Sequence, residues 1–308
     1  MILITEFMNE KAVDLLRSKY HVIYDKSLAD NQEKIPDMMT DIKAIIVRNR
    51  TQVNANLVNN SPNLKCVGRL GVGLDNIDLE SCKERNLTVY PATGANTNGV
   101  VEYVLTSALV LLRGAFNKTE EMVSGKWPRE QSSGNEISGK VLGLVGFGEI
   151  AQKTADLARS FNMEIMAFDP FLDKKSSAWN NVKNVDLEKL LKSSDVISVH
   201  TPLSESTRHL INSTNLNFMK KTAVIINAAR GGVIDDKALS EKLRKNEIKG
   251  AALDVFETEP MDVNSGSYFH GLKNVILTPH IAGVTEESNV NVSAMIADKI
   301  DQHLSSSI

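Results

Sequence analysis

The chain has 308 residues, 42% of them hydrophobic and 24% charged, a composition typical of globular proteins with room for two domains. Its formal net charge is −3, so the chain has no overall positive electrostatic potential. This argues against nucleic acid or an anionic membrane as a partner. The two cysteines, Cys66 and Cys82, lie in no metal-ligand spacing, so no metal site is expected. The N-terminal residues lack a signal-peptide pattern, which favours a cytoplasmic protein.

The first part of the chain alternates short apolar runs with amphipathic helical patterns. Strands are predicted at residues 1–7, 21–25, 43–49, 64–71 and 87–92, and helices at residues 10–20 and 79–86. Such a series predicts a parallel sheet that is covered by helices. A long apolar helix is predicted at about residues 100–116, and the loop that follows, at 125–139, is rich in glycine and serine.

A second series of strands follows this loop. The runs at 140–146, 164–170, 195–202, 223–229, 250–256 and 274–279 are predicted strands, and residues 287–304 form the last predicted helix. The sequence therefore predicts an α/β protein of two doubly wound parallel-sheet domains. A cleft between the domains would be lined by residues at the C-terminal ends of strands.

A glycine-rich turn joins the first strand of the second series to a helix. The stretch "GFGEIA" supplies Gly146, Gly148 and Ala151 in the spacing of a dinucleotide-binding loop, where the helix amides face a pyrophosphate. Asp169 ends the next strand, 21 residues after Gly148, where an acid accepts hydrogen bonds from ribose hydroxyls and repels a 2′-phosphate. This pattern predicts NAD rather than NADP as the cofactor.

Charged side chains follow three later strands. Arg230 is suited to a bidentate grip on a carboxylate. Asp254 and Glu259 follow the next strand, and His280 follows the last one. A histidine beside a carboxylate can donate and accept a proton near neutral pH. Together with a dinucleotide loop, these residues suggest hydride transfer to a 2-keto acid.

The stretches "GRLGVGLDNIDL", "PATGANTNGVVEY", "NAARGGVID", "ALDVFETEP" and "LTPHIAG" resemble the D-isomer-specific 2-hydroxyacid dehydrogenases, most of all the phosphoglycerate dehydrogenase branch. The resemblance implies a flavodoxin-like substrate domain formed by residues 1–98 and 287–308. It implies a Rossmann domain for NAD at residues 99–286, and a homodimer formed along the long helix and the loop after it.

The resemblance also implies a role for each site residue. Arg230 would hold the substrate carboxylate and carbonyl, His280 would be the general acid and base, and Glu259 would polarise His280. The implied cofactor contacts are Gly146, Gly148, Glu149, Ile150, Asp169, Thr201, Pro202, Ala228, Ala229, Arg230, Asp254, His280, Ala282 and Gly283. Glu149 stands where many members have arginine, and Tyr103 where many have histidine.

Substrate choice is expected to depend on the first domain. Backbone amides of Gly71, Val72 and Gly73 would help to bind the substrate carboxylate, and Arg48 and Arg50 would bind a second anionic group. A substrate related to 3-phosphoglycerate is expected. Sulfolactate dehydrogenase is an equally close resemblance, and hydroxypyruvate or glyoxylate reductase stays open. The alternative from another class is an NAD-sensing corepressor, which would bind NADH with little turnover.

Overall fold

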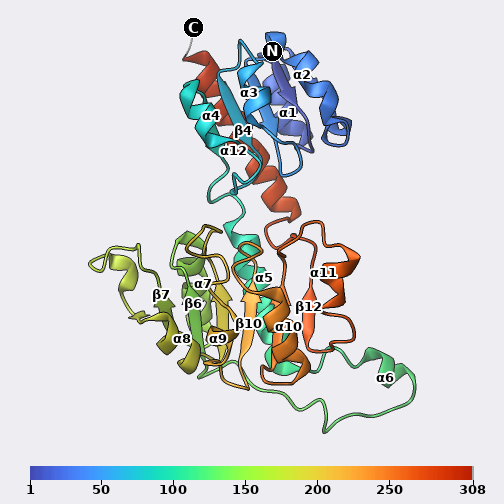
Figure 1. Cartoon of the computed structure of the whole chain (residues 1–308), viewed down its shortest axis with the longest axis vertical. Helices are drawn as coiled ribbons and strands as arrows, with labels where there is room; N and C mark the ends of the chain where they lie inside the picture. The colour runs from blue at the N-terminus through green and yellow to red at the C-terminus, as the bar shows by residue number, and fades with distance from the viewer. Residues whose placement is uncertain (307–308) are drawn as a thin grey trace. The chain divides into compact units, whose positions relative to one another are not determined.

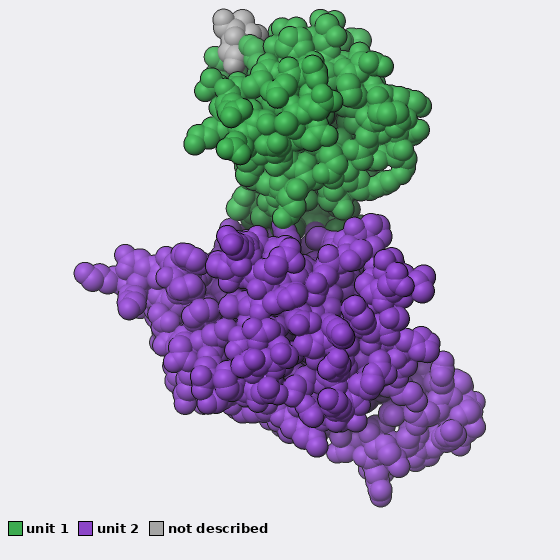
Figure 2. Space-filling view, in the orientation of Figure 1, with its two compact units in different colours: residues 1–96, 284–308 green, residues 97–283 purple. Residues whose placement is uncertain are grey.

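The computed structural model describes residues 1–306, which divide into two compact units (Figures 1 and 2). Unit 1 consists of Met1–Asn96 and Val284–Ile308, and unit 2 is Thr97–Gly283. The boundaries expected from the sequence, after residue 98 and before residue 287, lie close to these limits. Which unit takes the substrate and which takes the cofactor stays a prediction at this point.

Unit 1 contains a five-stranded parallel sheet in the order β2-β1-β3-β4-β5. Its strands are β1 (Ile2–Ile4), β2 (Val22–Tyr24), β3 (Ala44–Val47), β4 (Cys66–Arg69) and β5 (Thr88–Pro91). Its α-helices are α1 (Glu10–Arg17), α2 (Ile35–Met38), α3 (Ala55–Asn59), α4 (Leu79–Glu84) and α12 (Glu286–Ser305), with 3-10 turns η1 (Lys26–Ala29), η2 (Gln32–Lys34) and η3 (Met39–Asp41). This strand order is that of flavodoxin-like sheets.

The end of the chain belongs to unit 1 because α12 packs on its sheet. Ile296 and Ile300 lie over Gly68 of β4, where an added Cβ would come within 2.7 Å of the Ile296 side chain. A glycine at this point of the strand therefore lets the helix approach the sheet closely. Both faces of β1 and β3 are buried, as expected for parallel strands between two layers of helices.

Unit 2 contains a seven-stranded parallel sheet in the order β12-β11-β10-β9-β6-β7-β8. Its strands are β6 (Val141–Val145), β7 (Glu164–Phe168), β8 (Lys183–Asn184), β9 (Val196–Val199), β10 (Val224–Asn227), β11 (Gly250–Leu253) and β12 (Val275–Leu277). Its helices are α5 (Thr97–Arg113), α6 (Thr119–Val123), α7 (Glu149–Ser160), α8 (Leu187–Ser193), α9 (Ser213–Leu216), α10 (Asp236–Arg244) and α11 (Val263–Ser267), with the 3-10 turn η4 (Ser177–Trp179).

The predicted fold class is confirmed, because both units are doubly wound parallel α/β sheets. The sequence missed the short helices α2 and α3 of unit 1, and the edge strand β8 and the helix α6 of unit 2. Strand order reverses between β6 and β9, which makes the loops after these strands the topological switch point where α/β sheets bind ligands. No helix among residues 1–306 is long and apolar enough to cross a membrane.

Candidate active site

The glycine-rich turn lies at the switch point of unit 2. Gly146 follows β6 with a φ of 89°, and an added Cβ would lie 2.9 Å from the carbonyl of His200 after β9. Only glycine tolerates both the conformation and this contact. Gly148 caps α7 with ordinary extended backbone, and a Cβ there would meet no atom within 4 Å. The protein itself therefore does not need glycine at position 148, whereas a ligand lying against the backbone would.

An unsatisfied polar atom lies on the other side of the same turn. The hydroxyl oxygen of Thr201 is buried and has no hydrogen-bond partner, and its methyl group lies beside Gly146. A buried hydroxyl group without a hydrogen-bond partner destabilises the fold unless a bound ligand supplies that hydrogen bond. The open backbone at Gly148, the start of α7 and this hydroxyl together fit the pyrophosphate end of NAD.

Asp169 lies at the end of β7, where its carboxylate already accepts three backbone hydrogen bonds. Oδ2 accepts from the amide of Phe147 at 2.8 Å, and Oδ1 accepts from the amides of Phe171 and Leu172 at 2.9 and 3.0 Å. The carboxylate thus ties the glycine turn to the loop after β7. Each carboxylate oxygen has two lone pairs, and three of these four sites are used, so Oδ2 can still accept one hydrogen bond from a ribose hydroxyl.

The remaining predicted cofactor contacts are dispersed around the ends of β6, β9 and β10. Glu149 is exposed at the start of α7 and accepts a hydrogen bond from the hydroxyl of Thr97 at 3.2 Å. Ile150 and Ala228 pack against one hydrophobic core of unit 2, and Ala229 against the other. Pro202 is exposed beyond β9.

The carboxylate of Asp254 organises the turn after β12. The side chain is 1% exposed, and its oxygens accept hydrogen bonds from the hydroxyl of Thr278 at 2.6 Å and from the amides of Ile281 and Ala282 at 2.8 Å each. The backbone carbonyl of Asp254 accepts a further bond from the amide of His280 at 2.8 Å. These hydrogen bonds to Asp254 hold the turn in place.

A tyrosine extends this network to α5. The hydroxyl of Tyr103 lies 2.7 Å from that of Thr278, which gives its own proton to Asp254. Tyr103 must therefore be the donor in the pair. Burial is the main reason that the pKa of Tyr103 lies above its ordinary value, so the phenol keeps its proton.

The side chains of Glu259 and His280 contact each other directly. The ring Nδ1 of His280 lies 2.6 Å from Oε2 of Glu259, and Oε1 of Glu259 accepts the amide of Phe256 at 2.9 Å. Burial alone raises the pKa of Glu259, but the bonds from His280 and Phe256 and the charges of His280 and Arg230 outweigh it, and the pKa lies below its ordinary value. Glu259 is therefore ionised at neutral pH, facing the ring.

His280 is held with a φ of 55°, a left-handed conformation that is uncommon for residues other than glycine. The hydrogen bonds that Asp254 accepts from this turn fix the backbone, and the side chain of His280 remains 44% exposed. One ring nitrogen is thus occupied by the carboxylate, which leaves Nε2 as the nitrogen that can face a substrate.

Arg230 follows β10 in a turn that Asn227 holds. The side-chain amide of Asn227 donates to the carbonyl of Arg230 at 3.0 Å, and its oxygen accepts the amide of Ala229 at 3.1 Å. One guanidinium nitrogen of Arg230 donates to the carbonyl of Ala229 at 2.6 Å. Arg230 contributes to the lowered pKa of Glu259, and Glu259 contacts His280. The three predicted catalytic residues follow the neighbouring strands β10, β11 and β12 of one sheet.

His200 lies at the end of β9 and has different surroundings. Its Nε2 is 2.9 Å from the hydroxyl of Ser198, and burial lowers its pKa to about 4. The ring is therefore neutral at physiological pH, and it cannot serve there as a charged proton donor.

The two arginines predicted to bind a second anion do not share a partner. Arg50 is exposed and forms a salt bridge with Asp30. Arg48 is half-buried at the end of β3 and donates to the side-chain oxygen of Asn289 at 2.9 Å. Burial lowers the pKa of Arg48, yet the group stays charged at neutral pH.

The loop that carries both arginines is fixed by a buried acid that the sequence did not reveal. The carboxylate of Glu6 is 4% exposed and accepts hydrogen bonds from the backbone amides of Arg48, Arg50 and Thr51. Gly71, Val72 and Gly73 follow the adjacent strand β4. An added Cβ on Gly71 would overlap the guanidinium of Arg69, so glycine is needed there for Arg69 to cover the backbone.

Asn227, Thr278 and Glu6 are therefore the residues that sequence reasoning missed. Their only signal was a polar residue at the end of an apolar strand pattern. Among residues 1–306, no group of three or more histidine, cysteine, aspartate or glutamate side chains could hold a metal ion.

Comparison with known proteins places these features in a family. Residues 105–282 match the NAD binding domain of the D-isomer specific 2-hydroxyacid dehydrogenases. The (S)-sulfolactate dehydrogenase of Chromohalobacter salexigens is 45% identical over 304 residues, which is 98% of each chain. The D-3-phosphoglycerate dehydrogenase of Archaeoglobus fulgidus is 36% identical over 299 residues, and the match spans only 56% of its length.

Among solved structures, the TT0316 protein of Thermus thermophilus is similar over nearly the whole chain. It has a TM-score of 0.90 and 29% sequence identity, and the alignment covers 99% of this chain and 97% of that one.

Proposed function

Because the chain belongs to the D-isomer specific 2-hydroxyacid dehydrogenases, we propose that it interconverts a 2-hydroxy acid carrying a second anionic group with the corresponding 2-keto acid. It is an NAD-dependent enzyme by family. We propose sulfolactate as the substrate rather than phosphoglycerate. The sulfolactate dehydrogenase relative is 45% identical over 304 residues, whereas the phosphoglycerate dehydrogenase relative is 36% identical over 299 residues.

The observation that carries the proposal is the pair of Glu259 and His280, 2.6 Å apart in a turn that Asp254 fixes. In reduction, His280 donates the proton on Nε2 to the carbonyl oxygen of the keto acid, and Glu259 stabilises the charged ring before the transfer. In oxidation, the same nitrogen accepts the proton of the hydroxyl group. Arg230 binds the substrate carboxylate with two hydrogen bonds and thereby orients the reacting carbon.

The cofactor is assigned to the turn at the switch point of unit 2. NADH, when bound, supplies the hydride. The backbone at Gly148 and the first turn of α7 would hold its pyrophosphate, with the hydroxyl of Thr201 beside them. Asp169 would accept a hydrogen bond from the adenosine ribose through Oδ2, and its negative charge would repel the 2′-phosphate of NADP.

Arg48 is the better candidate of the two arginines for the second anion. Its guanidinium is half-buried, and the contact with Asn289 is with a neutral group, whereas Arg50 is exposed and already neutralised by Asp30. An ion pair formed by a half-buried guanidinium is more stabilising than one formed by an exposed guanidinium, because water screens the exposed pair more strongly. Sulfonate and phosphate both accept hydrogen bonds from guanidinium in the required geometry.

A substrate panel tests this assignment. We expect NADH oxidation to be fastest with sulfopyruvate among sulfopyruvate, phosphohydroxypyruvate, hydroxypyruvate and glyoxylate. Arg48→Ala should lower kcat/KM for sulfopyruvate by about 10-fold or more, as expected for the loss of a charged hydrogen bond worth about 1.5–3 kcal/mol. Arg50→Ala is the matched control and should change it by less than about 2-fold. Equal losses in both variants, or hydroxypyruvate as the best substrate, would count against the second anionic group.

A second prediction concerns the proton. His280→Gln should lower kcat for keto-acid reduction by about 10²-fold or more because the general acid is lost. The dissociation constant of NADH, measured by fluorescence titration, should stay near the unmodified value. His21→Gln, a change of an exposed histidine in unit 1, is the control. If His280→Gln kept nearly full kcat, the proton would have to come from another group, and the neutral His200 could not supply it.

A third prediction concerns pH. Glu259→Gln should leave measurable turnover but move the pH optimum of reduction to more acidic values. The neutral amide no longer stabilises a proton on His280, so the ring loses this proton at a lower pH and reduction, which needs it, declines earlier. The dependence of kcat/KM on pH measures the shift, with Glu205→Gln, an exposed acid, as control. Superimposable profiles of Glu259→Gln and the unmodified enzyme would mean that Glu259 does not act through the ring.

We also propose that the protein is a homodimer. The projecting arm, residues 114–136, leaves the body of unit 2 as an extended segment that carries α6 (Figure 1). Phe116, Met122, Val123 and Trp127 on this arm are 68%, 42%, 82% and 76% exposed. So many exposed apolar side chains on one short segment are typical of an interaction surface.

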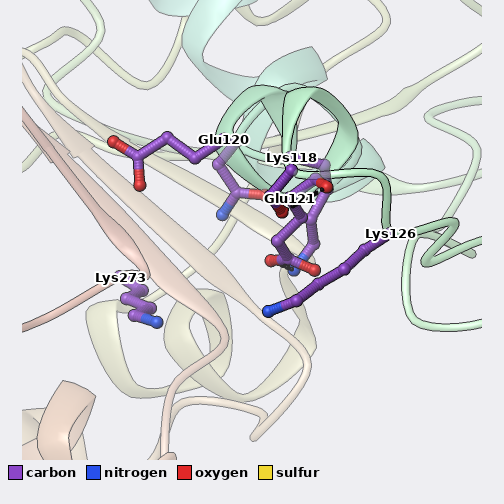
Figure 3. Close-up of a pocket in the computed structure, with 7 residues that line it drawn as sticks. Lys118, Glu120, Glu121, Lys126 and Lys273 are labelled. Atoms are coloured by element: carbon purple, nitrogen blue, oxygen red, sulfur yellow. Dashed lines mark hydrogen bonds and ion pairs between the residues drawn. The ribbon is translucent and has the colours of Figure 1, made fainter.

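The chain leaves much of the surface of these four side chains exposed. A hollow of about 540 Å³ next to it is polar, and is lined by Asn117, Lys118, Glu120, Glu121, Ser124, Lys126 and Lys273 (Figure 3). Glu121 and Lys118 form an ion pair at 3.0 Å there. The apolar side chains are thus left for a partner. A second copy of this chain, in a two-fold isologous arrangement, would bury the arms of both subunits.

A fourth prediction tests this assembly. The unmodified protein should have a mass by light scattering of twice the 33.9 kDa of one chain, at micromolar concentration. Changing both Val123 and Trp127 to Glu should yield a folded species of single-chain mass, because two charges cannot be buried in an apolar interface at low cost. Val263→Glu, on an equally exposed valine in α11, should leave the mass unchanged. A single-chain mass for the unmodified protein would contradict the proposal.

A further inference from the structure

The segment that carries Arg230 lies directly against the segment that carries Glu259. An added Cβ on Gly231 would come within 1.7 Å of the backbone oxygen of Phe256 and 2.1 Å of its carbonyl carbon. Since both atoms are backbone, no side-chain movement could make room. Glycine at position 231, directly after Arg230, therefore allows the segment after β10 to touch the segment after β11, three residues before Glu259.

Two carboxylates tie the same segments together a few residues further on. The amide of Asp236, the first residue of α10, donates to Oε1 of Glu257 at 3.2 Å. The amide of Glu257 donates to Oδ2 of Asp236 at 3.1 Å. Each side chain thus accepts the backbone donor of the other. We call this reciprocal pair the carboxylate clasp.

His209 adds a third segment to the clasp. Its Nε2 lies 3.1 Å from Oε1 of Glu257, and its amide donates to the carbonyl of Gly232 at 2.7 Å. Gly232 is two residues beyond Arg230, so the turn after Arg230 is bounded on one side by His209 and on the other by Phe256.

The clasp places a buried acid among other charges. Asp236 is 5% exposed and Glu257 is part-exposed, with Asp235 and His209 also facing Asp236. Burial, with the negative charges of Glu257 and Asp235, raises the pKa of Asp236 to about 6, although the amide of Glu257 and the charge of His209 act in the opposite direction. Burying the ionised carboxylate of Asp236 lowers the stability of the fold at neutral pH. The geometry of the clasp therefore indicates a role other than stabilising the fold.

We propose that Asp236 and Glu257 are positioning residues that set the spacing between Arg230 and the pair of Glu259 and His280. The proposal rests on the proposed function, because it presumes that Arg230 binds the substrate carboxylate and that His280 transfers the proton. These two groups must contact two ends of one small molecule. A displacement of about 1 Å between them is enough to lower the rate by about 10²-fold.

Substitution of Asp236 by asparagine or by alanine distinguishes the effect of the hydrogen bond in the clasp from the effect of the negative charge. Asp236→Asn keeps an oxygen that can accept the amide of Glu257, whereas Asp236→Ala removes the acceptor. Asp186→Ala is the matched control, since Asp186 also accepts a backbone amide at the start of a helix, that of Lys189 at the start of α8. Both alanine variants remove a carboxylate that accepts a backbone amide, but Asp186 lies at no segment of the site.

Steady-state kinetics of keto-acid reduction and NADH titration by fluorescence test the proposal. Asp236→Ala should raise KM for the keto acid and lower kcat, with a combined loss in kcat/KM of about 10-fold or more, while the dissociation constant of NADH changes by less than about 2-fold. Asp236→Asn should restore kcat/KM to within about 2-fold at pH 7.5 and melt at or above the unmodified enzyme, because the desolvated charge is gone. Asp186→Ala should lower the melting temperature without changing KM or kcat.

The proposal is overturned if Asp236→Ala, still folded, has KM and kcat like those of Asp186→Ala, since the clasp would then serve stability alone. If Asp236→Ala does not fold, Glu257→Ala is measured instead, with the same expected and contrary results, because its side chain is only two-thirds covered. His280→Gln in the same assay keeps the two hypotheses apart. Full activity of that variant would refute the proposed function, whereas its inactivity beside a fully active Asp236→Ala would refute only the clasp.

Discussion

The buried carboxylate of Asp254 is the interaction on which the geometry of the site depends. A charge with 1% of its surface exposed is tolerable only when its oxygens accept hydrogen bonds from the protein. The hydroxyl of Thr278 and the amides of Ile281 and Ala282 satisfy this requirement, and they all come from one turn. His280 lies inside that turn, so the bonds that solvate the charge also hold the histidine backbone in its left-handed conformation. If the turn after β12 moved away, the buried carboxylate of Asp254 would lose its hydrogen bonds. The need to satisfy this carboxylate therefore keeps the turn rigid, whether or not a substrate is bound.

The parallel sheet explains why residues from separate segments meet at this turn. β10, β11 and β12 are neighbours in unit 2, and their C-terminal ends lie at one edge of the sheet. Arg230, Glu259 and His280 each follow one of these strands. Strand spacing alone would leave the side chains several ångströms apart without fixed directions. The contact of Gly231 with Phe256 and the bonds around Asp254 supply the directions, because they fix the loops relative to one another.

The sequence predicted both sheets because strands buried on two faces are continuous apolar runs, such as those of β3 and β10. It missed β8, two exposed residues at the sheet edge, and α6, which has no buried face to create a helical pattern. The neighbourhood of Glu259 and His280 was expected from the resemblance, and the structure has them 2.6 Å apart, while their catalytic roles stay predictions. The different partners of Arg48 and Arg50 could not be predicted, because Asn289 and Asp30 are distant in sequence and only the folded unit 1 brings them close.

The two histidines at strand ends illustrate how burial decides which of them can carry a proton. His200 lies among buried groups, with a neutral hydroxyl as its partner, and desolvation brings its pKa to about 4. A ring of this kind is an uncharged hydrogen-bonding group at neutral pH. His280 is part-exposed, and its partner is a carboxylate whose own pKa is held below the ordinary value. An ionised neighbour stabilises a protonated ring, and exposure lets that ring reach a substrate. The same side chain at the ends of two strands of one sheet is therefore suited to structure at β9 and to acid–base chemistry after β12.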